Sequence, residues 1–224
     1  MNPSSFIRVK ICCISSVKEA QLAIKYGASA LGLLSEMPSG PGVINEELIT
    51  EIVKTVPPPI ATFLLTSKTS AEEIFIQQRK TKVNTLQLVD FVDFEELKKL
   101  RRNLPEVKLV QVIHVLDEKS VEEAIAVETF VNALLLDSGN PNLDVKVLGG
   151  TGRKHNWDVS REIRERVNIP LFLAGGLNSG NAVDAIEKVG PFGLDICSGV
   201  RTNGELDEEK IKLFFNEVNK VNVK

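Results

Sequence analysis

Eight short apolar segments, each followed by a helix-like pattern, are the feature that most restricts the fold of this chain. The segments are continuously apolar, as expected for parallel strands buried on both faces of a sheet. Eight strand–helix units predict an α/β protein built as a closed parallel (βα)8 TIM barrel. A doubly wound sheet is the alternative, but it rarely needs so regular a count. The segments are residues 7–11, 30–34, 60–65, 85–88, 109–112, 133–136, 171–173 and 193–196.

Helix-start signals lie between these segments. Ser16 and Ser70 are each followed three residues later by glutamate, the spacing of a capping box, and Asp93 has the same spacing to Glu96. Asn178 and Asp207 are expected to cap the last two helices.

Composition sets limits on the class of protein. The 224 residues, 43% of them hydrophobic, fit one domain over residues 1–224. A net charge of −3 offers no basic surface to a nucleic acid, and no apolar stretch approaches the roughly 20 residues that span a bilayer. Three cysteines, two of them adjacent, cannot form a disulfide framework, and the first residues lack the pattern of a signal peptide. We therefore expect a cytoplasmic protein that uses neither nucleic acid nor membrane as a partner.

One connection is much longer than the others. It runs from Asp137 to a helix expected near Trp157 and contains a Gly-Gly-Thr-Gly sequence. Loops of this length in a compact domain are usually functional, and on a barrel this one would lie over the active face as a lid.

Two glycine-rich exits from the last two strands predict an anion site. Gly175 and Gly176 follow the seventh segment, and Ser198 and Gly199 follow the eighth. Glycine lets backbone N–H groups approach an anion closely, and barrel enzymes often bind phosphate at this pair of loops. A tight turn would explain one such exit, but two on adjacent strands favour phosphate binding.

Cys12 and Asp137 stand at the ends of the first and sixth segments, where barrel enzymes place their catalytic groups. A carboxyl among apolar residues can have a raised pKa and act as a general acid. A cysteine held as thiolate can act as the base. Alone, the thiol would be read as a small core residue and the aspartate as a cap. Together, above a phosphate site, they form a candidate acid–base pair.

Lys10 and Asp195 form a second candidate pair across the strands that would close the barrel. Asp195 would contact a ligand, pair with Lys10, or do both, and we favour the pairing. The chain has neither His-x-x-x-His nor Cys-x-x-Cys spacing, and it has no dinucleotide or Walker fingerprint. We therefore expect neither a metal nor another cofactor.

A series of motifs, taken in order, resembles the phosphoribosylanthranilate isomerase family of tryptophan biosynthesis. The resemblance implies a (βα)8 barrel that needs no cofactor. It also implies an aldose–ketose isomerase that converts an aminoaldose phosphate to an aminoketose phosphate by an Amadori rearrangement. The motifs are Lys10-Ile11-Cys12 with Ile14-Ser15, Gln87 in Leu-Gln-Leu, Leu-Leu-Asp137-Ser138, Gly149-Gly150-Thr151-Gly152, Leu173-Ala-Gly-Gly-Leu-Asn178, and Asp195 with Ser198-Gly199-Val200.

The resemblance also implies roles for individual residues. Asp137 would protonate the furanose ring oxygen, and Cys12 would remove the C2′ proton. The partner would be a phosphorylated sugar–amine substrate, and the protein would be a monomer or a homodimer. Gly176, Ser198 and Gly199 would lie in the phosphate cradle together with Gly175, and Gly150 and Thr151 in the loop above the substrate.

Three departures from the family pattern are present. Cys13 replaces the glycine that usually follows the catalytic cysteine, and Gln87-Leu88-Val89-Asp90 replaces Gln-Leu-His-Gly. Residues 35–42 lack the arginine of the family's Ser-Pro-Arg motif, which meets the anthranilate carboxylate. Its loss should remove about 1.5–3 kcal/mol of binding free energy unless Arg153 or Arg201 replaces it.

The departures lie on the amine side of the expected substrate. Two alternatives therefore remain beside the tryptophan-pathway reaction. One is a paralogue that acts on a different phosphosugar, and the other is a non-catalytic barrel that binds a phosphate metabolite.

Overall fold

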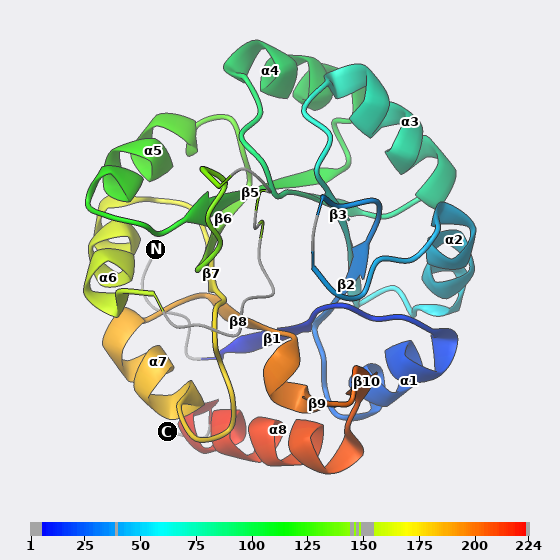
Figure 1. Cartoon of the computed structure of the whole chain (residues 1–224), viewed down its shortest axis with the longest axis vertical. Coiled ribbons are helices and arrows are strands. Elements are labelled where there is room, and N and C mark those ends of the chain that lie inside the picture. The colour runs from blue at the N-terminus through cyan, green and yellow to red at the C-terminus, as the bar shows by residue number, and fades with distance from the viewer. Residues whose placement is uncertain (1–5, 39, 144–145, 147, 149–154, 223–224) are drawn as a thin grey trace.

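The computed structural model describes residues 6–38, 40–143, 146, 148 and 155–222. Eight parallel strands pair in the order β1 to β8 and close into a barrel, which confirms the predicted architecture. The helices form a ring outside the strands, and α8 completes it between α7 and α1 (Figure 1). Gly150, Thr151 and Arg153 lie outside the described residues.

The strands match the apolar segments closely. The second, fourth, seventh and eighth agree to the residue, and the fifth extends to His114 because its pairing with β6 continues to the register His114–Asp137. The strands are β1 Arg8–Ile11, β2 Ala30–Leu34, β3 Ala61–Thr66, β4 Thr85–Leu88, β5 Lys108–His114, β6 Ala133–Asp137, β7 Leu171–Leu173 and β8 Gly193–Ile196. The helices are α1 Val17–Lys25, α2 Glu46–Thr55, α3 Ala71–Thr81, α4 Phe94–Asn103, α5 Lys119–Val127, α6 Trp157–Arg166, α7 Ala182–Val189 and α8 Glu208–Asn222. A single 3-10 turn, η1 (Ser198–Val200), and the short strands β9 (Arg201–Thr202) and β10 (Glu205–Leu206) connect β8 to α8.

The pleat of each strand divides the core into two layers. In β1, Val9 and Ile11 belong to the larger apolar cluster between the strands and the helices. Cys12 belongs to a second cluster inside the barrel, where Phe63 and Phe172 pack edge to face with ring centroids 5.9 Å apart. Because successive residues alternate between layers, Lys10 and Cys12 share the inner face of β1. The pleat therefore brings these two polar side chains toward one another.

Closure of the barrel depends on the pairing of β1 with β8. Lys10 is in register with Asp195, and Ile11 with Ile196. The amide of Cys12 continues this ladder by donating to the carbonyl of Ile196 at 2.8 Å. The first and last strands thus place Cys12 beside the loop that follows β8.

The expected caps are correct at three helices and wrong at two. Ser16, Asp93 and Asp207 accept hydrogen bonds from the first turns of α1, α4 and α8. Ser70 precedes α3 but makes no capping bond, and Glu96 of the neighbouring helix accepts from the first amide of α3, that of Ala71, at 2.7 Å. Helix α7 begins at Ala182, after Asn181, and Asn178 instead accepts from the amide of Gly180 in the preceding turn.

Ser16 and Ser70 make a matched pair for testing the cap. Ser16→Ala should lower the free energy of unfolding by about 1 kcal/mol, because it leaves the amide of Glu19 without its partner at 3.1 Å. Ser70→Ala should change it by no more than a few tenths of a kcal/mol, since no capping bond is lost. Urea unfolding of both variants measures the difference, and equal losses would contradict the assigned caps.

Candidate active site

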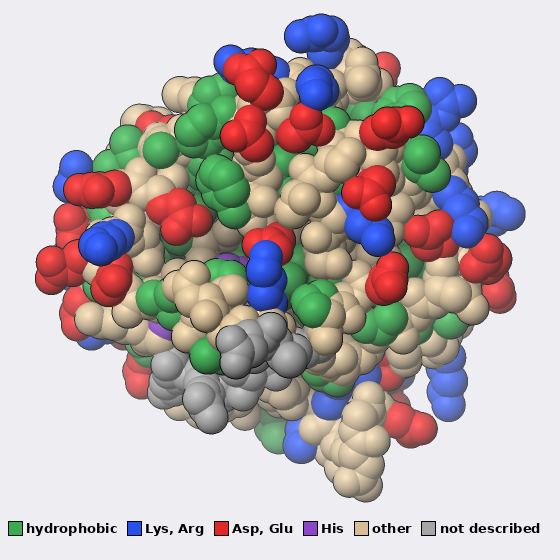
Figure 2. Space-filling model, turned by 45° about the horizontal axis from the view of Figure 1, so that its top comes forward, with side chains coloured by type: hydrophobic (Ala, Val, Ile, Leu, Met, Phe, Trp, Pro, Cys, Tyr) green, Lys and Arg blue, Asp and Glu red, His purple; other side chains and the backbone are tan. Residues whose placement is uncertain are grey.

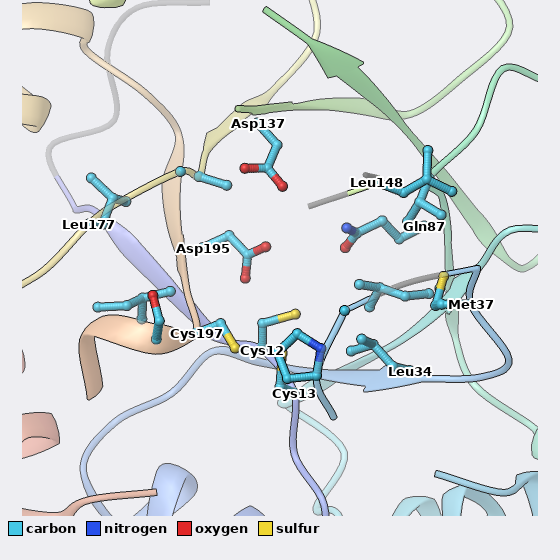
Figure 3. A pocket seen from close by; sticks show the side chains of 18 of the residues that line it. Cys12, Cys13, Leu34, Met37, Gln87, Asp137, Leu148, Leu177, Asp195 and Cys197 are labelled. Atoms are coloured by element: carbon cyan, nitrogen blue, oxygen red, sulfur yellow. The ribbon is translucent and has the colours of Figure 1, made fainter. Parts of the chain in front are cut away.

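A pocket lies at the carboxyl ends of the strands. Asp137, Asp195, Gln87 and Cys12 all line it, and Figure 3 shows their polar atoms directed into the same space. These side chains come from four different strands or strand ends, which only the closed barrel brings together. The site residues expected from the sequence at β1, β4, β6 and β8 therefore meet in one place.

The side chains of Cys12 and Lys10 both lie against Gly32 of the neighbouring strand, where a larger residue would not fit. A β carbon on Gly32 would lie 2.9 Å from the Cys12 sulfur and 3.0 Å from Lys10 Nζ. Lys10 is fully buried, and its Nζ is 2.8 Å from Asp195 Oδ1. Burial alone would lower the pKa of Lys10, but Asp195 and the neighbouring thiols Cys12 and Cys13 raise it above its usual value. The ammonium group is therefore held charged beside the thiol.

Asp195 pairs with Lys10, the interpretation favoured from the sequence, and it also lines the pocket. Its carboxylate points into the open space seen in Figure 3, while its Oδ1 binds the ammonium group of Lys10. A buried ion pair at the floor of the pocket fixes the local charge without placing a net charge there.

Asp137 has the environment expected of a general acid. It ends β6, and its Oδ1 accepts from the amide of Ser138 at 2.7 Å. Burial raises the pKa of Asp137, and the negative charge of Asp195 raises it further, while His114 and Lys10 oppose the shift. The carboxyl group therefore retains its proton to a higher pH than an exposed aspartate does.

The two glycine-rich loops lie against one another beside these groups. Gly175 and Gly176 have φ values of 81° and 64°, which favour glycine, and both line the pocket together with Ser198. Gly199 is not among the lining residues. Its missing β carbon would lie 2.0 Å from the carbonyl oxygen of Leu177, so glycine at this position allows the two loops to approach.

The opposite side of the pocket is apolar. Residues of β2 and β3 and of the loops after β2, β4 and β6 line it, and they were not singled out from the sequence because each resembles an ordinary core residue. Cys197 was missed in the same way, although it stands between Asp195 and Ser198. The apolar residues are Leu34, Met37, Pro41, Leu65, Val89 and Leu148.

Three basic side chains on the loops around this region, all in the described part of the chain, are paired with acids. Arg201, considered as a substitute for the missing arginine, is bound to Glu19 at 2.9 Å and does not line the pocket. Lys68 pairs with Glu36 at 3.3 Å, and Lys146 with Asp90. The structure therefore does not support Arg201 as a substitute for the missing arginine.

The outer surface has mixed charge. On the face drawn in Figure 2, acidic and basic side chains are interspersed around the rim. Within the described part of the chain, no helix is long and apolar enough to cross a bilayer. In the same residues, no group of three or more His, Cys, Asp or Glu side chains is arranged to hold a metal ion.

Comparison with known proteins agrees with this arrangement. The family model for N-(5'-phosphoribosyl)anthranilate (PRA) isomerase matches residues 9–217. The N-(5'-phosphoribosyl)anthranilate isomerase of Methanosarcina acetivorans is 34% identical, over 94% of this chain and 92% of its own length. Isomerase 2 of Methanosarcina mazei is also 34% identical, over 94% of this chain and 93% of its own.

Solved structures share the fold over the same length. Phosphoribosyl anthranilate isomerase from Thermotoga maritima superimposes with a TM-score of 0.83 at 28% identity, covering 96% of this chain and all of that one. A phosphoribosyl anthranilate isomerase in complex with reduced 1-(o-carboxyphenylamino)-1-deoxyribulose 5-phosphate gives a TM-score of 0.80 at 26% identity, with the same coverage. From the family match and the identity over nearly its whole length, the chain belongs to the N-(5'-phosphoribosyl)anthranilate isomerase family.

Proposed function

We propose that this protein catalyses the Amadori rearrangement of N-(5'-phosphoribosyl)anthranilate to the aminoketose phosphate. The observation that carries the proposal is the meeting of Cys12 and Asp137 in one pocket, beside the loops of Gly175 and Ser198. The reaction moves protons only, so an acid and a base held on either side of the sugar suffice.

In the first step, Asp137 donates its proton to the furanose ring oxygen. The C1′–O bond then breaks, and the nitrogen lone pair forms a protonated Schiff base at C1′. The raised pKa of Asp137, caused by burial and by Asp195, supports this role because the acid must be protonated at neutral pH.

In the second step, the Cys12 thiolate removes the proton from C2′. The electron pair of the C–H bond forms the double bond of an enolamine, and the iminium nitrogen becomes neutral. The enolamine then tautomerises to the ketone. The position of Cys12 supports this role, because its side chain lines the pocket together with Asp137 and points into the same space.

Binding of the substrate uses the two contrasting sides of the pocket. Backbone groups at Gly175, Gly176 and Ser198 would hold the phosphate. The apolar side of the pocket, which includes Leu34 and Leu148, would accept the planar ring. The Oε1 atom of Gln87 is buried without a hydrogen-bond partner in the described residues, so it is ready to accept from a substrate hydroxyl. The ligand of the solved relative carries both a phosphate and a carboxyphenylamino group, which fits this division.

A phosphosugar carrying a different amine remains a second candidate, favoured by one observation. Lys68 and Lys146, near the apolar side, are paired with Glu36 and Asp90, so the anthranilate carboxylate meets no unpaired cation there among the described residues. We further propose a cytoplasmic location, supported by the three free cysteines.

Steady-state kinetics with phosphoribosylanthranilate tests the proposed function. Cys12→Ser and Asp137→Asn should each lower kcat/KM by about 10²–10⁴-fold, because each removes one proton-transfer group. Asp158→Asn is the matched control: Asp158 pairs with Lys188 on the surface, and kcat should stay within about twofold.

Two outcomes would contradict this assignment. If both variants keep the activity of the parent, Cys12 and Asp137 are not the acid–base pair. If the parent binds phosphosugars but converts none, the protein is a binding barrel.

Asp137→Asn should also change stability in a pH-dependent way. Since its pKa is raised in the folded state, the folded protein holds this proton more tightly than the unfolded chain does. Stability is therefore lost as pH rises above the ordinary value of 3.8 and through the raised pKa. Asparagine does not titrate, so the variant avoids this loss. The difference in free energy of unfolding, variant minus parent, should therefore be larger at pH 7 than at pH 4.

Urea unfolding at both pH values measures the effect, with Asp158→Asn as the control. A difference between variant and parent that does not change with pH would mean that Asp137 titrates as an ordinary carboxyl group.

A further inference from the structure

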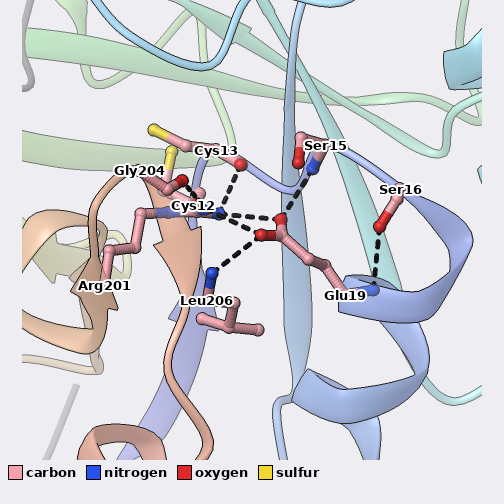
Figure 4. A network of polar contacts seen from close by, with 8 residues as sticks. All are labelled: Cys12, Cys13, Ser15, Ser16, Glu19, Arg201, Gly204 and Leu206. Atoms are coloured by element: carbon pink, nitrogen blue, oxygen red, sulfur yellow. Dashed lines mark hydrogen bonds and ion pairs between the residues drawn. The ribbon is translucent and has the colours of Figure 1, made fainter.

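Arg201 and Glu19 form a bidentate, largely buried ion pair beside residues 12–15, the segment that follows β1 (Figure 4). Arg201 Nη1 donates to Glu19 Oε1 at 2.9 Å, and Nη2 donates to Oε2 at 3.0 Å. The two side chains are only 9% and 12% exposed. Such a fork fixes both partners in direction as well as in distance, which a lysine could not do.

The carboxylate of Glu19 also holds the backbone on both sides of it. It accepts from the amide of Ser15 at 2.9 Å, just before α1, and from the amide of Leu206 at 2.8 Å, in the β10 strand. Burial opposes ionisation of Glu19, but the donors from Arg201, Ser15 and Leu206 lower its pKa overall. One carboxylate therefore connects the segment before α1 to the β9–β10 segment that follows the last barrel strand.

The guanidinium group of Arg201 reaches the residues that carry the chemistry. Nη2 donates to the carbonyl of Cys13 and, at 3.4 Å, to that of Cys12. Nη1 donates to the carbonyl of Gly204 at 2.8 Å, so the arginine is itself held by the β9–β10 turn. The segment after β1 is thus held at three points. Arg201 binds the carbonyls of Cys12 and Cys13, and Glu19 binds the amide of Ser15.

This segment needs such support because of Cys13. Its φ of 62° lies in the left-handed region, which residues with a β carbon rarely adopt. Room for its side chain comes from Gly42, whose missing β carbon would lie 2.7 Å from the β carbon of Cys13. Gly42 supplies the space, while the bond from Arg201 stabilises the carbonyl direction that this conformation produces.

We propose that Arg201 and Glu19 are positioning residues for the Cys12 base. By holding the left-handed turn at Cys13, they direct the thiol of Cys12 into the pocket. This role rests on the proposed isomerase function, and neither residue touches the substrate.

Kinetics of Arg201→Gln and Arg201→Lys test the proposal. Both variants should lower kcat about 10–100-fold, because a small displacement of the base costs rate, while KM stays within about threefold. Lys25→Gln is the matched control. Lys25 lies in α1, as Glu19 does, and forms an exposed ion pair with Glu208 of α8 at 2.7 Å, so its loss should keep kcat within about twofold. Should Arg201→Gln fail to fold, Arg201→Lys decides the question.

A second substitution separates positioning from general stability. Glycine adopts the left-handed conformation without strain, so Cys13→Gly should raise kcat at least about fivefold when added to Arg201→Gln. The same change should have a smaller effect in the parent. An equal effect in both backgrounds, or a kcat of Arg201→Gln and Arg201→Lys within twofold of the parent, would overturn the proposal.

Amide hydrogen exchange keeps this test independent of the substrate. Exchange over residues 13–16 should be at least about tenfold faster in Arg201→Gln than in the parent, and unchanged in Lys25→Gln. Unchanged exchange in Arg201→Gln would also overturn the positioning role. If the parent does not convert phosphoribosylanthranilate, the proposed function fails while the exchange measurement still decides whether the pair holds the turn.

Discussion

The buried ion pair between Lys10 and Asp195 is the interaction on which the site depends. Two charges inside a barrel are costly to desolvate, and they persist only where each compensates the other at hydrogen-bond distance, here 2.8 Å. The pair spans the β1–β8 seam, so it can form only when the barrel is closed in the observed register. The same contact leaves the ammonium group beside Cys12 and the carboxylate near Asp137, where it raises the pKa of that acid. The contact thus links the register of barrel closure to the electrostatic environment of the proposed acid and base.

The β strands were predictable because each is buried on both faces, which leaves a continuous apolar signal in the sequence. The cap of α3 was not: Ser70 has the expected spacing but makes no capping bond, and the first amide of the helix is bound by Glu96 of another helix, a contact that the local sequence does not reveal. The role of Asp195 needed the register of β8, which apolar periodicity does not supply. Gly199 showed a similar limit, since its close approach to Leu177 is a contact between the loops after two adjacent strands, and its tightness depends on how these loops pack.

The departures from the family pattern become clearer once their neighbours are known. Cys13 in place of glycine is accompanied by Gly42 against its side chain and Arg201 at its carbonyl. Asp90, at the altered end of β4, binds Lys146 of the long loop, so that substitution created a contact between two loops above the pocket. Cys13 and Asp90 thus each have a specific partner, whereas the groups proposed for acid, base and phosphate binding keep the family's residue types.

The position of Lys10 in the chain has a consequence for biosynthesis. The ribosome delivers β1 first, and Asp195 follows 185 residues later. Until then, the nascent chain carries an ammonium group on its apolar inner face with no carboxylate in register. Burying that charge unpaired would be strongly unfavourable, which disfavours premature closure of a smaller barrel during synthesis. The site therefore becomes chemically complete only after the last strand of the barrel has been synthesised and paired with the first.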